Sequence, residues 1–143
     1  MPSSPILRIL TALPLLVLLA SAACRTVPML TPGPIPAPLG AEGNRMAILR
    51  GMIIHRWMLQ EELPGAMVLR QSKADRHVAI VNVSYDEDSI DITYLGSEGL
   101  QCEPQGESCA EIHRAYNRWV VQLAEDIRYG IELVRIENVA AEP

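Results

Sequence analysis

The stretch His77–Tyr94, HVAIVNVSYDEDSIDITY, decides the fold class of this chain. Apolar residues occupy alternate positions in both halves, as Val81 and Val83 do in the first half and Ile90 and Ile92 in the second. A period of two places such side chains on one face of a strand. The acidic triplet DED between the halves is typical of a turn, so the stretch predicts two antiparallel strands with one covered face.

Two further strands are predicted upstream of this pair. Trp57–Leu63 and Ala66–Gln71 flank the turn dipeptide Pro64-Gly65, so we expect them to pair as a hairpin. Together with His77–Tyr85 and Ile90–Tyr94 they predict a four-stranded antiparallel meander.

A helix is predicted on each side of the meander. Asn44 can cap the first helix, which is expected to run to about Arg56, although Gly51 weakens it. The second helix begins with Ser108 and Glu111 at capping-box spacing and carries an apolar stripe of helical period. The stripe consists of Ile112, Tyr116, Trp119, Val120, Leu123 and Ile127. The sequence therefore predicts a two-layer α+β fold, in which the C-terminal amphipathic helix packs on one face of the sheet.

The N-terminal residues have the anatomy of a secretory signal peptide. Met1–Ala23 contains one charged side chain, Arg8, then an apolar run, and then small residues directly before Cys24. The apolar run is shorter than the roughly 20 residues of a membrane-spanning helix. The arrangement resembles a bacterial lipobox, and this resemblance implies that Cys24 is acylated once the peptide is removed. Ordinary secretion, with Cys24 as a free thiol, is the alternative.

Residues 24–42 are predicted to link the anchor to the folded domain. Arg25–Leu39, RTVPMLTPGPIPAPL, contains five prolines and favours an extended, polyproline-like spacer. The spacer is either a stalk or a disordered leader without a selected length. We expect the folded domain over residues 43–138, followed by a tail at 139–143.

The charge balance limits the partners that this chain can have. Its formal net charge is -5, and removal of Arg8 with the signal peptide leaves 17 acidic against 11 basic groups, or -6. Nucleic acid is not an expected partner, because phosphate binding needs a positive surface. The sequence also shows no polybasic run for anionic lipid, so a membrane tether has to be hydrophobic.

The cysteines predict a disulfide. If Cys24 is acylated, Cys102 and Cys109 remain as a pair in an exported protein, where oxidation is normal. The alternative is a zinc site, because His113 follows Cys109 by four residues and would share its helical face. No cofactor is expected otherwise.

Polar residues near the start of the last helix form a possible recognition face. His113 and Asn117 lie one helical turn apart, and Arg114 and Arg118 form a second row beside them. The other interpretation is an ordinary solvated face. We do not expect an enzyme, because no catalytic motif is present, but a small envelope hydrolase using His113 with Tyr116 or Ser97 is the alternative.

The segment IHRAYNRWVVQLAEDI, Ile112–Ile127, resembles the last helix of a family of small uncharacterised proteobacterial lipoproteins. The likeness extends to Ser89–Leu100, His77–Asp86 and Glu61–Gly65. It implies the architecture described above and a location in the cell envelope, but no established activity, cofactor or catalytic residue. In lipoproteins a residue other than Asp after the acylated cysteine, here Arg25, implies sorting to the outer membrane, with the domain in the periplasm.

The chain departs from this family in two segments and in its cysteine pair. Gly96-Ser97 and Gly99-Leu100 stand where family members often carry Asp-Ser and Asn-Leu, and the members lack the pair formed by Cys102 and Cys109. We therefore do not expect this chain to have a polar site that depends on those family side chains. The sequence predicts a lipid-tethered, non-enzymatic binding or scaffolding module whose partner is an envelope protein or a cell-wall component.

Overall fold

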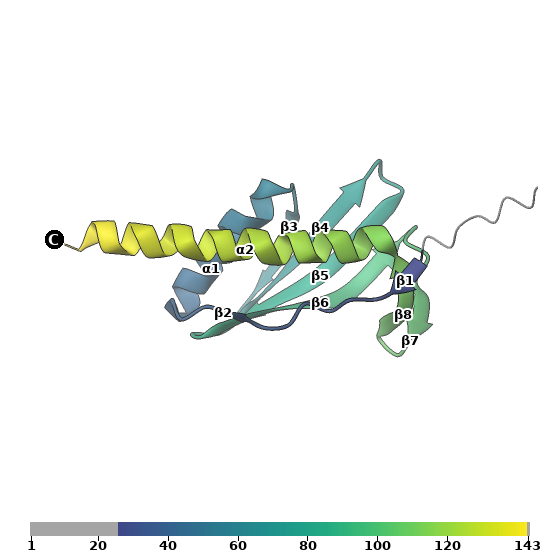
Figure 1. The fold of residues 1–143 in the computed structure, drawn as a ribbon, viewed down its shortest axis with the longest axis horizontal. Coiled ribbons are helices and arrows are strands. Elements are labelled where there is room, and N and C mark those ends of the chain that lie inside the picture. Colours follow the sequence, from purple (N-terminus) through teal and green to yellow (C-terminus); the bar gives the residue numbers. More distant parts are fainter. Residues whose placement is uncertain (1–25, 143) are drawn as a thin grey trace, which may run out of the picture.

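Residues 26–142 are described by the computed structural model, in which two helices and two antiparallel sheets form an α+β fold (Figure 1). The larger sheet contains the predicted meander, whose strands pair in chain order: β3 (Met58–Leu63), β4 (Ala66–Lys73), β5 (His77–Tyr85) and β6 (Ser89–Glu98). The prediction of four strands is wrong, however, because β2 (Ile35–Pro36) pairs with β6 and makes the sheet five-stranded.

One face of this sheet carries the apolar side chains that the alternation predicts. Val81, Val83 and Ile92 are at most 2% exposed. The register places Val83 opposite Met67 of β4 and also opposite Ile92 of β6, so these side chains share a face. Helices α1 (Gly40–Ile54) and α2 (Arg114–Ala141) cover that face, and the core lies between the helices and the sheet.

Helix α1 begins four residues before its predicted cap. Leu39 takes the N-cap position, and Asn44 lies inside the helix with a fully buried side chain. Its Nδ2 donates to the carbonyl oxygens of Ala37, at 2.6 Å, and of Asp86, at 2.8 Å. Asn44 therefore joins α1 to two other segments. The helix ends at Ile54, earlier than expected.

A second, three-stranded sheet precedes α2 and corrects the predicted start of the last helix. Its strands, in the order β1-β8-β7, are β1 (Thr26–Pro28), β8 (Ser108–His113) and β7 (Glu103–Gln105). Ser108 and Glu111 form no capping box, because both lie in β8, whose backbone pairs with two strands. Helix α2 begins at Arg114, and His113 caps it by accepting the Ala115 N–H at Nδ1, at 3.2 Å.

The apolar stripe of α2 packs against the core, with two differences from the prediction: Ile112 lies in β8, and Trp119 is not fully buried. Val120 and Leu123 are fully buried and Tyr116 is 1% exposed, whereas Trp119 is only partly buried at the edge of the core. The helix continues to Ala141, so the predicted domain boundary at residue 138 is too early. Its last turns project beyond the sheet (Figure 1).

The proline-rich segment is not the free spacer that the sequence predicted. From Thr26 onward it lies along the edge of the fold, where β1 pairs with β8 at one end and β2 pairs with β6 at the other (Figure 1). At the end of β1 and just after it, Asn117 of α2 holds the segment: Nδ2 donates to Pro28 O and Oδ1 accepts from Leu30 N, both at 2.9 Å. We call residues 26–39 the strap.

The prolines of the strap suit this edge position. Ile35 and Ala37 are 1% and 0% exposed, whereas Pro34, Pro36 and Pro38 on either side of them are exposed. Proline has no N–H to donate, so a sheet tolerates it at an edge, where it also blocks further pairing. The folded part therefore begins well before the predicted residue 43.

Helices α1 and α2 approach closely where each has a glycine. A Cβ on Gly51 would lie 2.7 Å from the backbone of Ile127, and a Cβ on Gly130 would lie 2.3 Å from the carbonyl oxygen of Ala47. Side chains at these positions would push the helices apart. Gly51, which by propensity only weakens α1, thus sets the distance between the helices.

Candidate functional site

A basic groove lies between the β4–β5 turn, the end of β8 and the start of α2. These segments lie at the same end of the molecule (Figure 1). It has a volume of about 290 Å³. Its lining residues are Lys73, Ala74, Arg76, His77, His113, Ala115, Arg118 and Trp119. Strand β4 ends at the first of these residues, β5 begins at the fourth and β8 ends at His113, so three strands and helix α2 position the polar side chains.

The groove is positively charged although the whole chain is acidic. No Asp or Glu lines it, and within residues 26–142 the side chains of Lys73, Arg76 and Arg118 have no carboxylate partner. Four other arginines each form an ion pair with a glutamate: Arg45, Arg50, Arg128 and Arg135. Unpaired cations in a hollow without acids favour an anionic ligand.

Two histidine rings stack within the groove. The ring centroids of His77 and His113 lie 5.5 Å apart, and the ring planes differ by 15°. His77 Nδ1 lies 2.8 Å from the carbonyl oxygen of Gly99, which can only accept, so this nitrogen carries a proton. His113 Nδ1 accepts the Ala115 N–H, so a neutral His113 ring carries its proton on Nε2. These bonds fix both ring orientations.

The β4–β5 turn that carries two of the cations has an unusual backbone. Ala74 and Asp75 have φ of 52° and 51°, in the left-handed region that asparagine and glycine favour in such hairpins. Each such residue costs roughly 1–2 kcal/mol in backbone sterics. Gly99 packs against this turn, because a Cβ there would lie 1.8 Å from the carbonyl oxygen of Arg76. The turn is therefore held in place by Gly99, the residue that follows β6.

A second, smaller compartment of about 180 Å³ adjoins the groove and shares two lining residues with it, Arg118 and Trp119. The other lining residues are His55, Trp57, Gln71 and Gln122. His55 Nδ1 donates to Asp126 Oδ2 at 2.7 Å, and Asp126 is 7% exposed. The Trp57 indole nitrogen is buried without an acceptor among the described residues. The lining of this compartment is thus polar as well as aromatic, with His55, Gln71 and Gln122 beside the two tryptophans.

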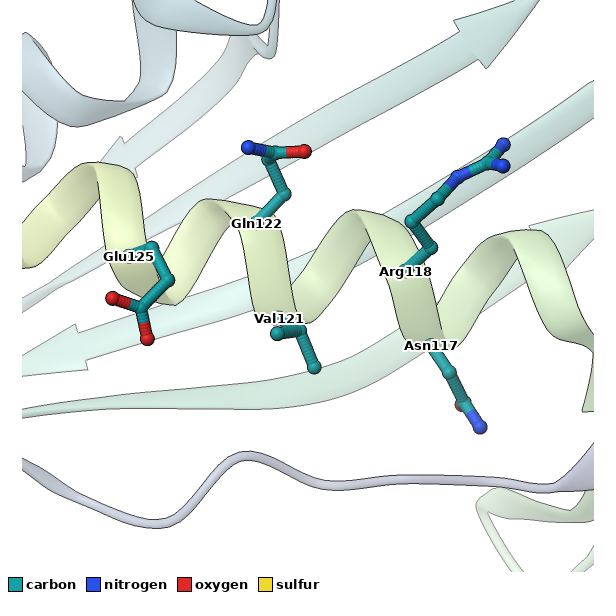
Figure 2. Close-up of a pocket in the computed structure, with 5 residues that line it drawn as sticks. All are labelled: Asn117, Arg118, Val121, Gln122 and Glu125. Atoms are coloured by element: carbon teal, nitrogen blue, oxygen red, sulfur yellow. The ribbon is translucent and has the colours of Figure 1, made fainter.

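The predicted recognition residues Asn117 and Arg118 lie on different sides of α2. In Figure 2, Arg118 and Gln122 extend from one side of the helix, while Asn117 and Val121 extend from the other. The hollow of about 360 Å³ between them is formed by α2 alone and is shallow. Arg118 therefore contributes to the basic groove, whereas Asn117 faces the strap.

The predicted face of four residues is thus only partly a site. His113 and Arg118 line the basic groove, and His113 also caps α2. Both amide atoms of Asn117 are used to hold the strap. Arg114 is exposed on α2 and does not line the groove.

The hydrolase alternative pairs His113 with Tyr116 or Ser97, but each of these hydroxyl groups has other neighbours. Ser97 Oγ lies 2.9 Å from the hydroxyl oxygen of Tyr94. Tyr116 is 1% exposed with its ring edge against Tyr94, and burial raises the pKa of its hydroxyl above the ordinary value. Neither hydroxyl lines the basic groove.

The predicted disulfide is present, and it removes the ligands of the zinc alternative. Cys102 and Cys109 are joined with a Cα–Cα distance of 5.4 Å, so no thiolate is left to bind zinc beside His113. Cys109 and His113 also lie on a strand, not on the predicted helix. Over residues 26–142, no three His, Cys, Asp or Glu side chains are grouped as a metal site.

Sequence and structure comparisons identify no relative. Searches with protein-family models, with curated proteins and with solved structures gave no significant match. Neither of the two helices in the described part of the chain is long and apolar enough to cross a membrane. The predicted acylation site, Cys24, lies outside the described residues.

Proposed function

We propose that this chain is a lipid-tethered, non-enzymatic binding module of the bacterial cell envelope, and that its basic groove holds an anionic envelope ligand. The lipobox-like sequence before Cys24 and the resemblance to small proteobacterial lipoproteins support the tether. Arg25 after the cysteine supports an outer-membrane location with the domain in the periplasm.

The main support for a ligand in the groove is the cluster of Lys73, Arg76 and Arg118. Three cations without carboxylate partners among residues 26–142 line one hollow of a chain whose net charge is -5. Charge-assisted hydrogen bonds are about twice as strong as neutral ones, so an anion bound there gains both affinity and orientation.

The proposal predicts that ligand recovery depends on the charges of the groove. Full-length protein is crosslinked in cell envelopes and purified, and the glycans, lipids and proteins that come with it are quantified by mass spectrometry. Replacing both Lys73 and Arg76 by Gln should lower recovery of the ligand about tenfold or more, because hydrogen bonds to charged groups contribute about 1.5–3 kcal/mol each.

A matched control separates the groove from overall charge. The double variant Arg114→Gln/Arg128→Gln also removes two positive charges, but from positions that do not line the groove. Recovery of the ligand should therefore be unchanged. If every recovered component is lost equally in both double variants, or in neither, the groove is not the binding site.

A further inference from the structure

The basic groove lies next to the point where the strap enters the fold. Thr26, the first described residue, pairs with His113 of the groove in the β1–β8 register. Cys24 precedes Thr26 by two residues. Two residues span at most about 7 Å of chain. An acylated Cys24 would therefore hold the groove at the membrane surface, because no free stalk separates the two.

The lining of the groove matches the chemistry of a phosphate group. Lys73, Arg76 and Arg118 supply ammonium and guanidinium donors, and none of the described residues that line the groove is acidic, since Asp75 of the same turn is not part of the lining. Trp119 is partly buried at the edge of the same groove. Tryptophan is typical of membrane–water interfaces, where its ring meets apolar groups and its N–H stays near polar ones.

We propose, on the basis of the proposed function, that the groove seats the phosphate headgroup of an anionic phospholipid from the membrane that holds the tether. The cations sit on the β4–β5 turn and on the first two turns of α2, at the end of the molecule where the strap begins (Figure 1). A diacyl lipid would place its phosphate there while its chains stay in the bilayer. The lipid anchor and the groove then bind the same surface and orient the domain on it.

The folded domain has a basic surface that the sequence alone does not indicate. A polybasic run is absent from the sequence, but the fold gathers cations from residues 73–76 and from Arg118 into one patch. Electrostatic attraction to an anionic membrane depends on charges within about a Debye length of its surface, not on the net charge of the chain. A local positive patch at the tethered end is therefore sufficient.

The test uses hydrogen–deuterium exchange of the full-length protein in nanodiscs. One sample contains phosphatidylcholine alone, a second contains phosphatidylcholine mixed with phosphatidylglycerol, and a third contains phosphatidylcholine with free inorganic phosphate in the buffer. Residues 73–77 should exchange about threefold more slowly, or slower still, with phosphatidylglycerol than with phosphatidylcholine alone, since a bound ligand suppresses local opening.

Two variants make the readout specific. Arg118→Gln should abolish the protection by phosphatidylglycerol, because this side chain lines the groove and has no ion-pair partner in the described part of the chain. Arg114→Gln lies one helical turn earlier, is exposed and does not line the groove, so it should keep the protection.

The remaining outcomes distinguish this inference from the proposed function. Protection by free phosphate without protection by phosphatidylglycerol overturns the lipid as ligand but leaves an anion-binding groove. No protection in either sample overturns the inference, and so does equal protection in the Arg118→Gln variant. The proposed function fails separately, if the capture from envelopes does not depend on Lys73 and Arg76.

Discussion

Replacing Asn44 by Asp should destabilise the fold by about 4 kcal/mol or more at neutral pH, although the two side chains have nearly the same shape. The Nδ2 of Asn44 donates to two carbonyl oxygens, of Ala37 and Asp86, and the residue is 0% exposed. A carboxylate oxygen in its place would lose both hydrogen bonds and put a buried negative charge against two acceptors. Urea unfolding monitored by tryptophan fluorescence measures the loss.

The Asn44→Ala variant is the matched control. It also leaves two carbonyl oxygens without their donor but adds no charge, so about 2–3 kcal/mol is expected. The Asp variant should also regain stability on acidification: burial raises the folded-state pKa of the new carboxyl, so the folded state binds the proton more tightly than the unfolded one. An Asp variant as stable as the Ala variant at pH 7 would contradict this account.

Gly51→Ala should destabilise the protein, although alanine is the better helix former. Helix propensity alone would give a gain of about 1 kcal/mol. The new Cβ would lie 2.7 Å from the backbone of Ile127 and 2.8 Å from that of Asp126, and overpacking of this kind costs typically 1–3 kcal/mol, occasionally more. Because backbone atoms cannot rotate away as a side chain does, the clash should dominate and leave a net loss of about 2 kcal/mol.

Gly33→Ala is the control for this substitution. Gly33 lies in the strap, and a Cβ there would meet nothing within 4 Å. Its free energy of unfolding should stay unchanged or rise slightly, because alanine restricts the unfolded chain. A stable Gly51→Ala variant would show that the helices do not need this close contact.

The meander and the covering helix could be predicted because their signals are local and periodic. Alternation in His77–Tyr85 determines which residues face the helices, and Val81 and Val83 are buried as expected. The disulfide followed from the count and spacing of the cysteines. Each of these inferences needs only neighbouring residues and one physical rule.

The errors arose where pairing partners far along the chain decide the local structure. Ser108 and Glu111 have the spacing of a helix cap, but pairing with β1 and β7 makes this segment a strand. The prolines of the strap excluded it from a sheet interior, yet an edge tolerates them because Ile35 and Ala37 still point inward. In both segments, tertiary contacts override a local preference of the sequence.

The candidate site could not be predicted for a related reason. The basic groove combines the β4–β5 turn with His113 and Arg118, and nothing in the sequence places these segments together. The pair formed by His55 and Asp126 spans 71 positions. The net charge of the chain does not indicate a basic groove either, because it sums over the whole surface and most glutamates lie outside the groove.

The most direct test of the central claim is photocrosslinking in living cells from single positions of the full-length protein. A photoreactive residue at Ala74, on the turn that lines the groove, should form adducts with an anionic envelope component, identified by mass spectrometry. The same residue at Glu132, which does not line the groove, should form none with that component. Adducts at both positions, or at Glu132 alone, would contradict a ligand-binding groove at the tethered end.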